Sequence, residues 1–342
     1  MKSFIAAVAA LAVSVSVAQA VSFTGMVNFG DSLSDVGNIH DLTTDIYPLH
    51  AIVPAAPYYN GRFSNGPIWV EQLAGLLSLP TPTPSRAGGA DYAYGLAHSG
   101  SGNTSVFIPN VQTQINDWTA NNISTSTQLF TVLGGATDLF DVIGDAGDQS
   151  AAAQQAANNI VAGLQSLYND GARNVLIGNL PDLGLVPGYH NTPDQSQATA
   201  LSNTFNTTLA TGLGNLGAAS PGLNLYLLNL NSLFNSAIAN PAAYGLSNVA
   251  DAAHTGDPDY EGAGSVVPDP SGYLFWDDVH PTTLVHSLVA QAAYAAVPEP
   301  ATTIFIFAAA SLLLRRRFPH ATESQLRQLY LRKITRCHNR ND

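Results

Sequence analysis

The chain has 342 residues, of which 46% are hydrophobic and 11% charged, and its formal net charge is −12. Residues 21–297 contain 21 acidic residues and only three basic ones, Arg62, Arg86 and Arg173, which leaves this part at −18. A field of that sign repels phosphate backbones and anionic lipid surfaces, so we exclude nucleic acid as a partner. The only cysteine, Cys337, lies outside this part, which therefore has no disulfide and no thiol nucleophile.

The first 20 residues have the pattern of a secretory signal peptide. Lys2 precedes an apolar run over residues 4–17, and Ala18-Gln19-Ala20 supplies the small residues that a signal peptidase recognises. We therefore expect cleavage after Ala20 and export of the remainder. A buried core helix is the alternative, and it is disfavoured because the segment lacks polar residues at helical spacing.

A serine follows the first apolar run after this segment. Met26 to Phe29 is typical of a buried strand, and Gly30-Asp31-Ser32 comes directly after it. Ligands of a parallel sheet bind outside the carboxyl ends of its strands, and a helix N-terminus offers free amide donors to developing negative charge. Ser32 is therefore placed like a nucleophile.

Apolar runs alternate with helix-compatible stretches along the rest of the chain. The alternation predicts β-α-β units, and hence an α/β fold with a parallel sheet and helices on both faces. The predicted strands are 26–29, 92–97, 129–133, 175–177 and 223–228. The predicted helices are 68–79, 111–118, 151–168, 198–213 and 283–296.

A possible base and its partner lie near the end of this region, in the stretch Phe-Trp-Asp-Asp-Val-His-Pro at residues 275–281. A serine that attacks an acyl group needs a base to take its proton, and the base needs an acceptor that fixes its tautomer. Asp277 and His280 supply both. A three-residue step lets the carboxylate reach one ring nitrogen while the other faces Ser32, provided that the fold brings the two segments together.

These two segments together resemble the GDSL (SGNH) family of esterases and lipases. The family resemblance covers residues 26–290 and includes Gly-Arg-Phe-Ser-Asn-Gly-Pro at 61–67. It implies a three-layer α/β/α, flavodoxin-like fold with a parallel five-stranded sheet in the order 2-1-3-4-5. It also implies that Ser32 is the nucleophile, His280 the general base and Asp277 its orienting partner.

The chain departs from the family pattern at the oxyanion hole, for which the resemblance implies Ser32, Gly95, Leu96 and Thr137. Members usually carry a glycine where this chain has Leu96, and an asparagine where it has Thr137. A backbone donor survives at position 96 if the leucine adopts the required dihedrals, whereas a threonine hydroxyl has a shorter reach than an asparagine amide. Losing one oxyanion donor costs about 3 to 4 kcal/mol of transition-state stabilisation, so we expect a slower esterase.

Residues 298–317 resemble the PEP-CTERM sorting signal of exported bacterial proteins, with Pro-Glu-Pro at 298–300, an apolar run at 301–314 and three arginines. The resemblance implies processing by an exosortase, with a temporary stay in the inner membrane before release to the cell surface or extracellular matrix. Fourteen residues at about 1.5 Å each are shorter than a ~30 Å hydrocarbon core, which fits a temporary span. Residues 318–342 continue as a basic tail whose pattern indicates no role.

Other segments give weaker signals. The loop at 40–65, which holds Tyr47, Tyr58 and Tyr59, either forms a substrate wall beside Ser32 or covers the sheet. Residues 257–262 resemble the start of a calcium loop but lack its later carboxylate ligand, so a solvated acidic turn is favoured.

Two functions agree with these observations. The favoured one is an exported serine esterase that acts without a metal or cofactor on a lipid, aryl or polysaccharide acyl ester. No metal is expected because His98, His190 and His254 have no partners at metal-ligand spacing. The alternative is a non-catalytic surface or matrix protein that keeps the fold with a degraded oxyanion hole.

Overall fold

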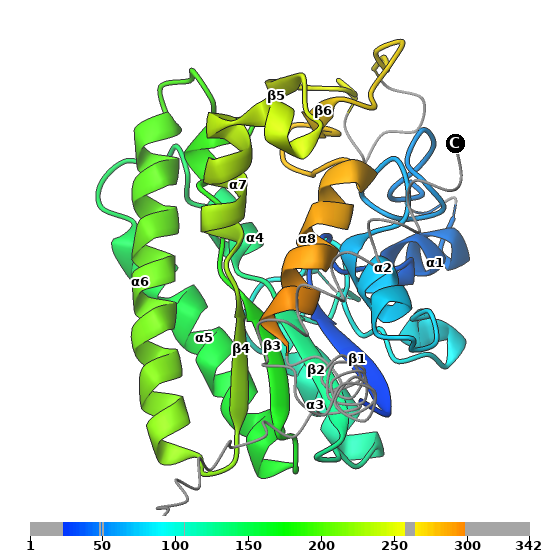
Figure 1. Ribbon diagram of the computed structural model, residues 1–342, viewed down its shortest axis with the longest axis vertical. Helices are drawn as coiled ribbons and strands as arrows, with labels where there is room; N and C mark the ends of the chain where they lie inside the picture. Colours follow the sequence, from blue (N-terminus) through cyan, green and yellow to red (C-terminus); the bar gives the residue numbers. More distant parts are fainter. Residues whose placement is uncertain (1–22, 48, 50, 106, 257–263, 298–342) are drawn as a thin grey trace, which may run out of the picture. The chain divides into compact units, whose positions relative to one another are not determined.

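A parallel sheet of four strands forms the centre of the fold, in the order β1-β2-β3-β4 (Figure 1). The computed structural model describes residues 23–47, 49, 51–105, 107–256 and 264–297. The expected signal peptide, sorting signal and basic tail, and the acidic turn at 257–262, lie outside these residues. The strands are β1 (Gly25–Gly30), β2 (Gln128–Leu133), β3 (Asn174–Gly178) and β4 (Asn224–Leu228).

The register aligns the carboxyl ends of the strands. Gly30 pairs with Leu133, and Gly178 pairs with Leu228, so the loops that follow all four strands leave from one edge of the sheet. β1, β2 and β3 are almost fully buried, as expected for strands covered on both faces, whereas β4 is half-exposed at the outer edge.

Helices cover both faces of the sheet. α2 packs on α8, whereas α3 and α6 pack on α5 on the other side (Figure 1). The predicted helices at 68–79, 111–118, 151–168, 198–213 and 283–296 are confirmed as α2, α3, α5, α6 and α8. No helix in the described part of the chain is long and apolar enough to cross a membrane. The helices are α1 (Asn38–Asp45), α2 (Trp69–Leu76), α3 (Val111–Asn121), α4 (Ala136–Phe140), α5 (Ser150–Asn169), α6 (Gln195–Ala219), α7 (Leu230–Ala239) and α8 (Thr283–Ala296).

The prediction of an α/β fold with a parallel sheet is confirmed, but its fifth strand is reduced to a single bridge. Asp91 pairs with Asn28 of β1, and the N–H groups of Tyr92 and Tyr94 donate to Asn28 and Gly30. The segment therefore follows the free edge of β1, in the place that the order 2-1-3-4-5 gives to strand 2. The ladder goes no further because the next amide of β1 on this side, the N–H of Gly30, donates to the side chain of Gln114 instead.

A second, two-stranded sheet leads into the predicted base. β5 (Asn248–Ala252) and β6 (Tyr273–Phe275) run parallel, and the N–H of His254 donates to the carbonyl of Trp276. These backbone bonds hold the residues just before Asp277, so the loop that carries His280 starts from a hydrogen-bonded strand.

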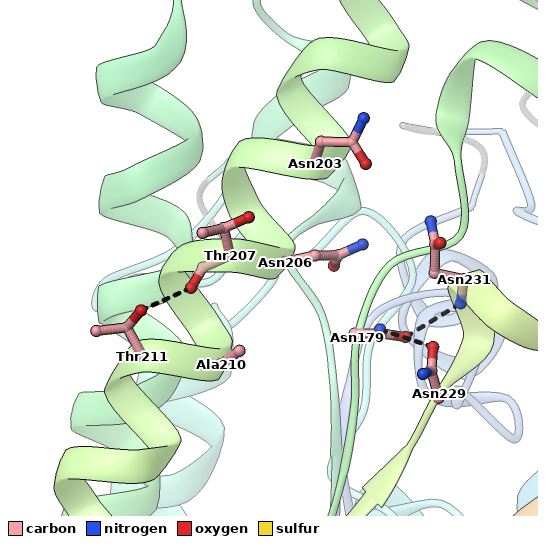
Figure 2. Close-up of a pocket in the computed structure, with 8 residues that line it drawn as sticks. All are labelled: Asn179, Asn203, Asn206, Thr207, Ala210, Thr211, Asn229 and Asn231. Carbon is pink, nitrogen blue, oxygen red and sulfur yellow. Dashed lines mark hydrogen bonds between the residues drawn. The ribbon is translucent and has the colours of Figure 1, made fainter.

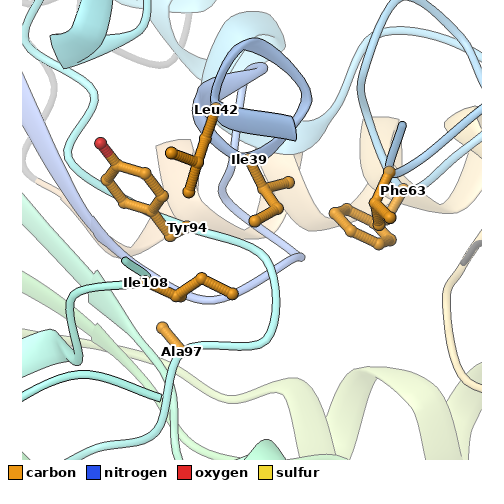
Figure 3. Packing of buried hydrophobic residues seen from close by; sticks show 7 residues of the cluster. Ile39, Leu42, Phe63, Tyr94, Ala97 and Ile108 are labelled. Atoms are coloured by element: carbon orange, nitrogen blue, oxygen red, sulfur yellow. The ribbon is translucent and has the colours of Figure 1, made fainter. Parts of the chain in front are cut away.

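An apolar cluster joins α1 to the two segments that flank the predicted site (Figure 3). Its members are all buried, and they come from α1, from the loop at 51–67 and from the segment at 91–110. Two of its members, Tyr94 and Ala97, flank the turn at Leu96 and thereby anchor this turn in the cluster. It consists of Ile39, Leu42, Val53, Phe63, Tyr94, Ala97 and Ile108.

Candidate active site

The peptide before the predicted nucleophile is fixed by a side chain of α3. Gln114 accepts a hydrogen bond from the N–H of Gly30 and donates to its carbonyl, both at 2.9 Å, as a neighbouring strand would. A side chain at position 30 does not fit, because its Cβ would lie 2.1 Å from the carbonyl oxygen of Leu133. Gly30 is therefore held at both its N–H and its carbonyl group, which fixes the point from which the chain continues to Ser32.

The structure brings Ser32, His280 and Asp277 together in one row. The Oγ of Ser32 lies 2.8 Å from Nε2 of His280, and Nδ1 of His280 lies 2.8 Å from Oδ2 of Asp277. Since an ionised carboxylate only accepts hydrogen bonds, Nδ1 carries the proton and donates a hydrogen bond to Asp277. The lone pair of Nε2 therefore faces the serine hydroxyl, as proton abstraction requires.

Asp277 stays ionised although it is buried. Burial alone would raise the pKa of its carboxyl, but the adjacent His280 and the hydrogen bonds to the carboxylate hold that pKa below its usual value. Oδ1 accepts the N–H of Val279 at 2.9 Å and that of His280 at 2.7 Å. The three-residue step thus closes a tight turn in which one carboxylate orients both the backbone and the ring of His280.

Tyr58 is a fourth member of this row that the sequence did not assign to the site. Its hydroxyl donates to Oδ2 of Asp277 at 2.7 Å, and its ring packs edge-on against Trp276 at 6.1 Å. The loop at 40–65 therefore contacts the site through Tyr58, at Asp277, whereas Tyr47 and Tyr59 are exposed. No local signal pointed to this contact, because the burial that leads a tyrosine hydroxyl to a hydrogen-bond partner is a property of the folded loop.

Replacing Tyr58 with phenylalanine is expected to lower kcat/KM for p-nitrophenyl acetate about tenfold. A hydrogen bond to a charged group stabilises by about 1.5 to 3 kcal/mol, and the acceptor here is the carboxylate that orients His280. Steady-state kinetics measure the change. Tyr226→Phe is the matched control, because that hydroxyl donates to the neutral amide of Asn174 at 3.0 Å. Equal kcat/KM values for the two variants would refute a role for Tyr58 in the row.

The segment Gly-Arg-Phe-Ser-Asn-Gly-Pro holds the loop of His280 in place. The ring of Phe63 lies 5.0 Å from the His280 imidazole, and Ser64 Oγ donates to the carbonyl of Pro281 at 2.9 Å. Asn65 accepts the N–H of Thr283 at 2.8 Å, where α8 begins. This segment is far from His280 in sequence, and its contacts explain why it accompanies the other two motifs.

The predicted oxyanion donors differ in how the fold uses their amides. The N–H of Gly95 donates to Oδ2 of Asp35 at 2.8 Å, so it is engaged inside the protein, contrary to expectation. Leu96 adopts the left-handed conformation, φ 67°, which glycine adopts far more readily than leucine, and it is 37% exposed. Thr137 is half-buried in the first turn of α4, directly after β2.

Two further titratable groups pack around the row. Burial raises the pKa of Asp31 to about 6, against the opposing effects of a hydrogen bond from Leu33 and of the nearby His280. Burial, together with the nearby His280, lowers the pKa of His286 to about 3, so His286 is neutral and accepts the N–H of Trp69 through Nδ1 at 3.2 Å. Its role is to join α8 to α2 behind the site.

Two histidines outside the row, His98 and His254, have structural partners. His98 Nε2 lies 2.7 Å from Oδ2 of Asp141, and the ring of His254 stacks on Trp276 at 5.4 Å. Among the described residues, no group of three or more His, Cys, Asp or Glu side chains could hold a metal ion.

A polar pocket of about 430 Å³ lies against α6, after the ends of β3 and β4 (Figure 2). Its lining includes neither Ser32 nor His280, and it holds no ionisable side chain, so it offers no base for acyl transfer. It is lined by Asn179, Asn203, Asn206, Thr207, Ala210, Thr211, Asn229 and Asn231.

Comparisons with known proteins identify the family of the chain. A family model described as GDSL-like Lipase/Acylhydrolase matches residues 26–293. The chain is 29% identical to the "Uncharacterized protein in trpE-trpG intergenic region" of Pseudomonas putida, over 85% of this chain and 51% of that protein. It is 34% identical to "Esterase EstA" of Pseudomonas aeruginosa, over 50% of this chain and 26% of that protein. The chain thus spans about half the length of the first relative and a quarter of the second.

Among solved structures, the chain is similar to the extracellular lipase of Streptomyces rimosus. It matches with 15% identity and a TM-score of 0.41, over 80% of this chain and 99% of that one.

Proposed function

Because the chain belongs to the GDSL-like lipase/acylhydrolase family, a family of carboxylic ester hydrolases, we propose that Ser32, His280 and Asp277 carry out its reaction. The observation that carries the proposal is the 2.8 Å approach of Ser32 Oγ to Nε2 of His280. The tautomer set by Asp277 supports it, since Nε2 is left free to accept a proton.

In the proposed mechanism, Ser32 Oγ attacks the ester carbonyl carbon while His280 Nε2 takes the hydroxyl proton. The tetrahedral intermediate collapses as His280 gives this proton to the departing alkoxide, which leaves as the alcohol. The acyl group remains bound to Ser32. Water then attacks the acyl carbon and passes a proton to His280. Collapse of the second intermediate returns that proton to Ser32 and releases the carboxylic acid.

The charge on the carbonyl oxygen needs donors. We assign this role to the N–H groups of Ser32 and Leu96 and to the hydroxyl of Thr137, because the N–H of Gly95 is already engaged by Asp35. The left-handed φ at Leu96 supports the assignment, since glycine, which family members usually carry at this position, is the residue that adopts such a φ most readily.

Replacing Thr137 with asparagine is expected to raise kcat about tenfold. One oxyanion donor contributes roughly 100- to 1,000-fold to kcat, and a threonine hydroxyl with a shorter reach supplies only part of this. Hydrolysis of p-nitrophenyl acetate measures the gain, with Thr204→Asn in α6 as the control for the same change elsewhere. An unchanged kcat in Thr137→Asn would count against the role given to position 137.

A non-catalytic surface or matrix protein is the second candidate, favoured by the engaged Gly95 amide and by threonine at position 137. Release of acid or alcohol from p-nitrophenyl acetate, an acylglycerol and an acetylated oligosaccharide separates the two candidates and identifies the substrate class. We expect saturable hydrolysis of at least one of them. Rates equal to buffer for all three would favour the non-catalytic protein.

We also propose that the protein is exported, with removal of residues 1–20 by signal peptidase and processing near Pro-Glu-Pro at 298–300 by an exosortase. The charge and apolar patterns of the two ends support this. The mature domain would then be residues 21–297. Mass spectrometry of the form found outside the cell tests it, and a species that retains residues 1–20 would contradict it.

A further inference from the structure

The Leu96 turn is held from both sides by carboxylates. Leu96 has φ 67°, a region that a leucine occupies only where its surroundings over-determine the conformation. The residue before it, Gly95, donates its N–H to a carboxylate at 2.8 Å, and so does Ser99, three residues after it. Both acceptors belong to segments that carry other members of the proposed active site.

The first carboxylate, Asp35, belongs to the turn of the nucleophile. It is fully buried three residues after Ser32, and it also accepts the N–H groups of Gly37 at 2.7 Å and Ile39 at 3.1 Å. Asp35 therefore ties the start of α1, the Ser32 turn and the peptide that enters Leu96 to one another. Its four backbone donors, which include Asn38, offset part of the cost of burying the charge.

The second carboxylate, Asp138, belongs to the helix of Thr137. One of its oxygens accepts the N–H of Ser99 at 2.8 Å, and the other accepts the Ser99 hydroxyl at 2.8 Å. Asn159 of α5 holds the same hydroxyl at 3.1 Å. The backbone that leaves the Leu96 turn is thereby fixed to α4, one residue from Thr137.

From these contacts we propose that Asp35 and Asp138 are positioning residues that hold the Leu96 amide in line with Ser32 and Thr137. The proposal rests on the proposed function, because it concerns how the oxyanion donors of that reaction are aligned. Three segments far apart in sequence each supply one donor, and two carboxylate-to-amide links connect them. A donor on a strained leucine thus keeps its direction without the glycine that the family pattern has there.

The test is Asp138→Asn, assayed on p-nitrophenyl acetate beside Asp170→Asn. Asp170 is the matched control, because its carboxylate accepts the backbone N–H of Ser124 at 3.1 Å near the opposite, amino-terminal edge of the sheet. An asparagine at 138 cannot accept both Ser99 bonds. We expect kcat to fall at least tenfold with KM within twofold, while Asp170→Asn changes kcat by less than twofold.

A second readout separates positioning from simple loss of structure. A boronic acid that forms a tetrahedral adduct with Ser32 should bind Asp138→Asn more weakly by the same factor as the loss in kcat, whereas a merely structural role would change the unfolding midpoint alone. Asp35→Asn, if it folds, should likewise lose kcat and boronic acid affinity by the same factor. Unchanged kcat and boronic acid affinity in Asp138→Asn, with active wild type, would overturn the proposal. Inactive wild type would instead contradict the proposed function.

Discussion

Replacing Ser32 with alanine is expected to lower kcat for p-nitrophenyl acetate by about 10⁴- to 10⁶-fold. The reaction forms its covalent bond at Oγ, and without that atom His280 has no hydroxyl to deprotonate at 2.8 Å. Only the oxyanion donors and substrate binding remain, and these alone leave a residual acceleration of about 10³ to 10⁴ over water in other serine hydrolases.

The matched control for Ser32→Ala is Ser101→Ala, which removes a hydroxyl from an exposed position in the loop after the Leu96 turn. We expect the control to keep kcat within twofold of the wild type. Circular dichroism checks that both variants fold. Hydrolysis by Ser32→Ala at the wild-type rate would show that another group performs the attack.

Replacing Asp277 with asparagine is expected to lower kcat about 10⁴-fold. A carboxamide can donate to Nδ1 of His280 and so favours the tautomer whose proton sits on Nε2. That proton would face Ser32, and the ring could no longer act as the base. The effect on KM should be small, because Asp277 is buried behind His280.

Asp278→Asn is the matched control, since it makes the same change at the next residue, which is exposed. We expect its kcat to stay within twofold of the wild type. A loss in Asp277→Asn no larger than in Asp278→Asn would remove Asp277 from the mechanism.

Asp277→Asn also has an expected effect on stability. The pKa of Asp277 is lowered by folding, so its contribution to the free energy of unfolding is present above the ordinary value of 3.8 and is lost as pH falls through the lower folded value. Asp31 and Asp35, whose pKa values are raised to about 6, act in the opposite sense. The difference between wild type and Asp277→Asn, measured by denaturant unfolding, should therefore shrink below pH 4.

The sequence predicted the architecture because its signal is local. Buried strands read as apolar runs, and α5 repeats buried residues such as Ala153, Ala157, Ile160 and Leu164 at helical spacing. The proximity of Ser32 to His280 could be inferred only from the joint presence of two motifs, since nothing local links residues 248 positions apart. The pairing of β5 with β6 was not predicted, because these two segments show no clear alternation of apolar and polar residues.

The remaining features depend on contacts that no local pattern encodes. Whether Tyr58 covers the sheet or touches Asp277 depends on how a loop folds relative to a residue 219 positions away. The fifth strand was overestimated because Tyr92–Ala97 is apolar enough for a strand, whereas the N–H of Gly30 donates to Gln114 and so ends the ladder. The engagement of the Gly95 amide likewise depends on Asp35, a residue 60 positions away.

Reaction with a labelled fluorophosphonate, followed by peptide mapping, tests most directly whether Ser32 is activated by His280 and Asp277. Covalent capture requires an activated serine, so we predict one labelled peptide, which contains Ser32, in the wild type. Labelling should be about 10⁴-fold slower in Asp277→Asn. Absence of label, or label on a different serine, would contradict the account.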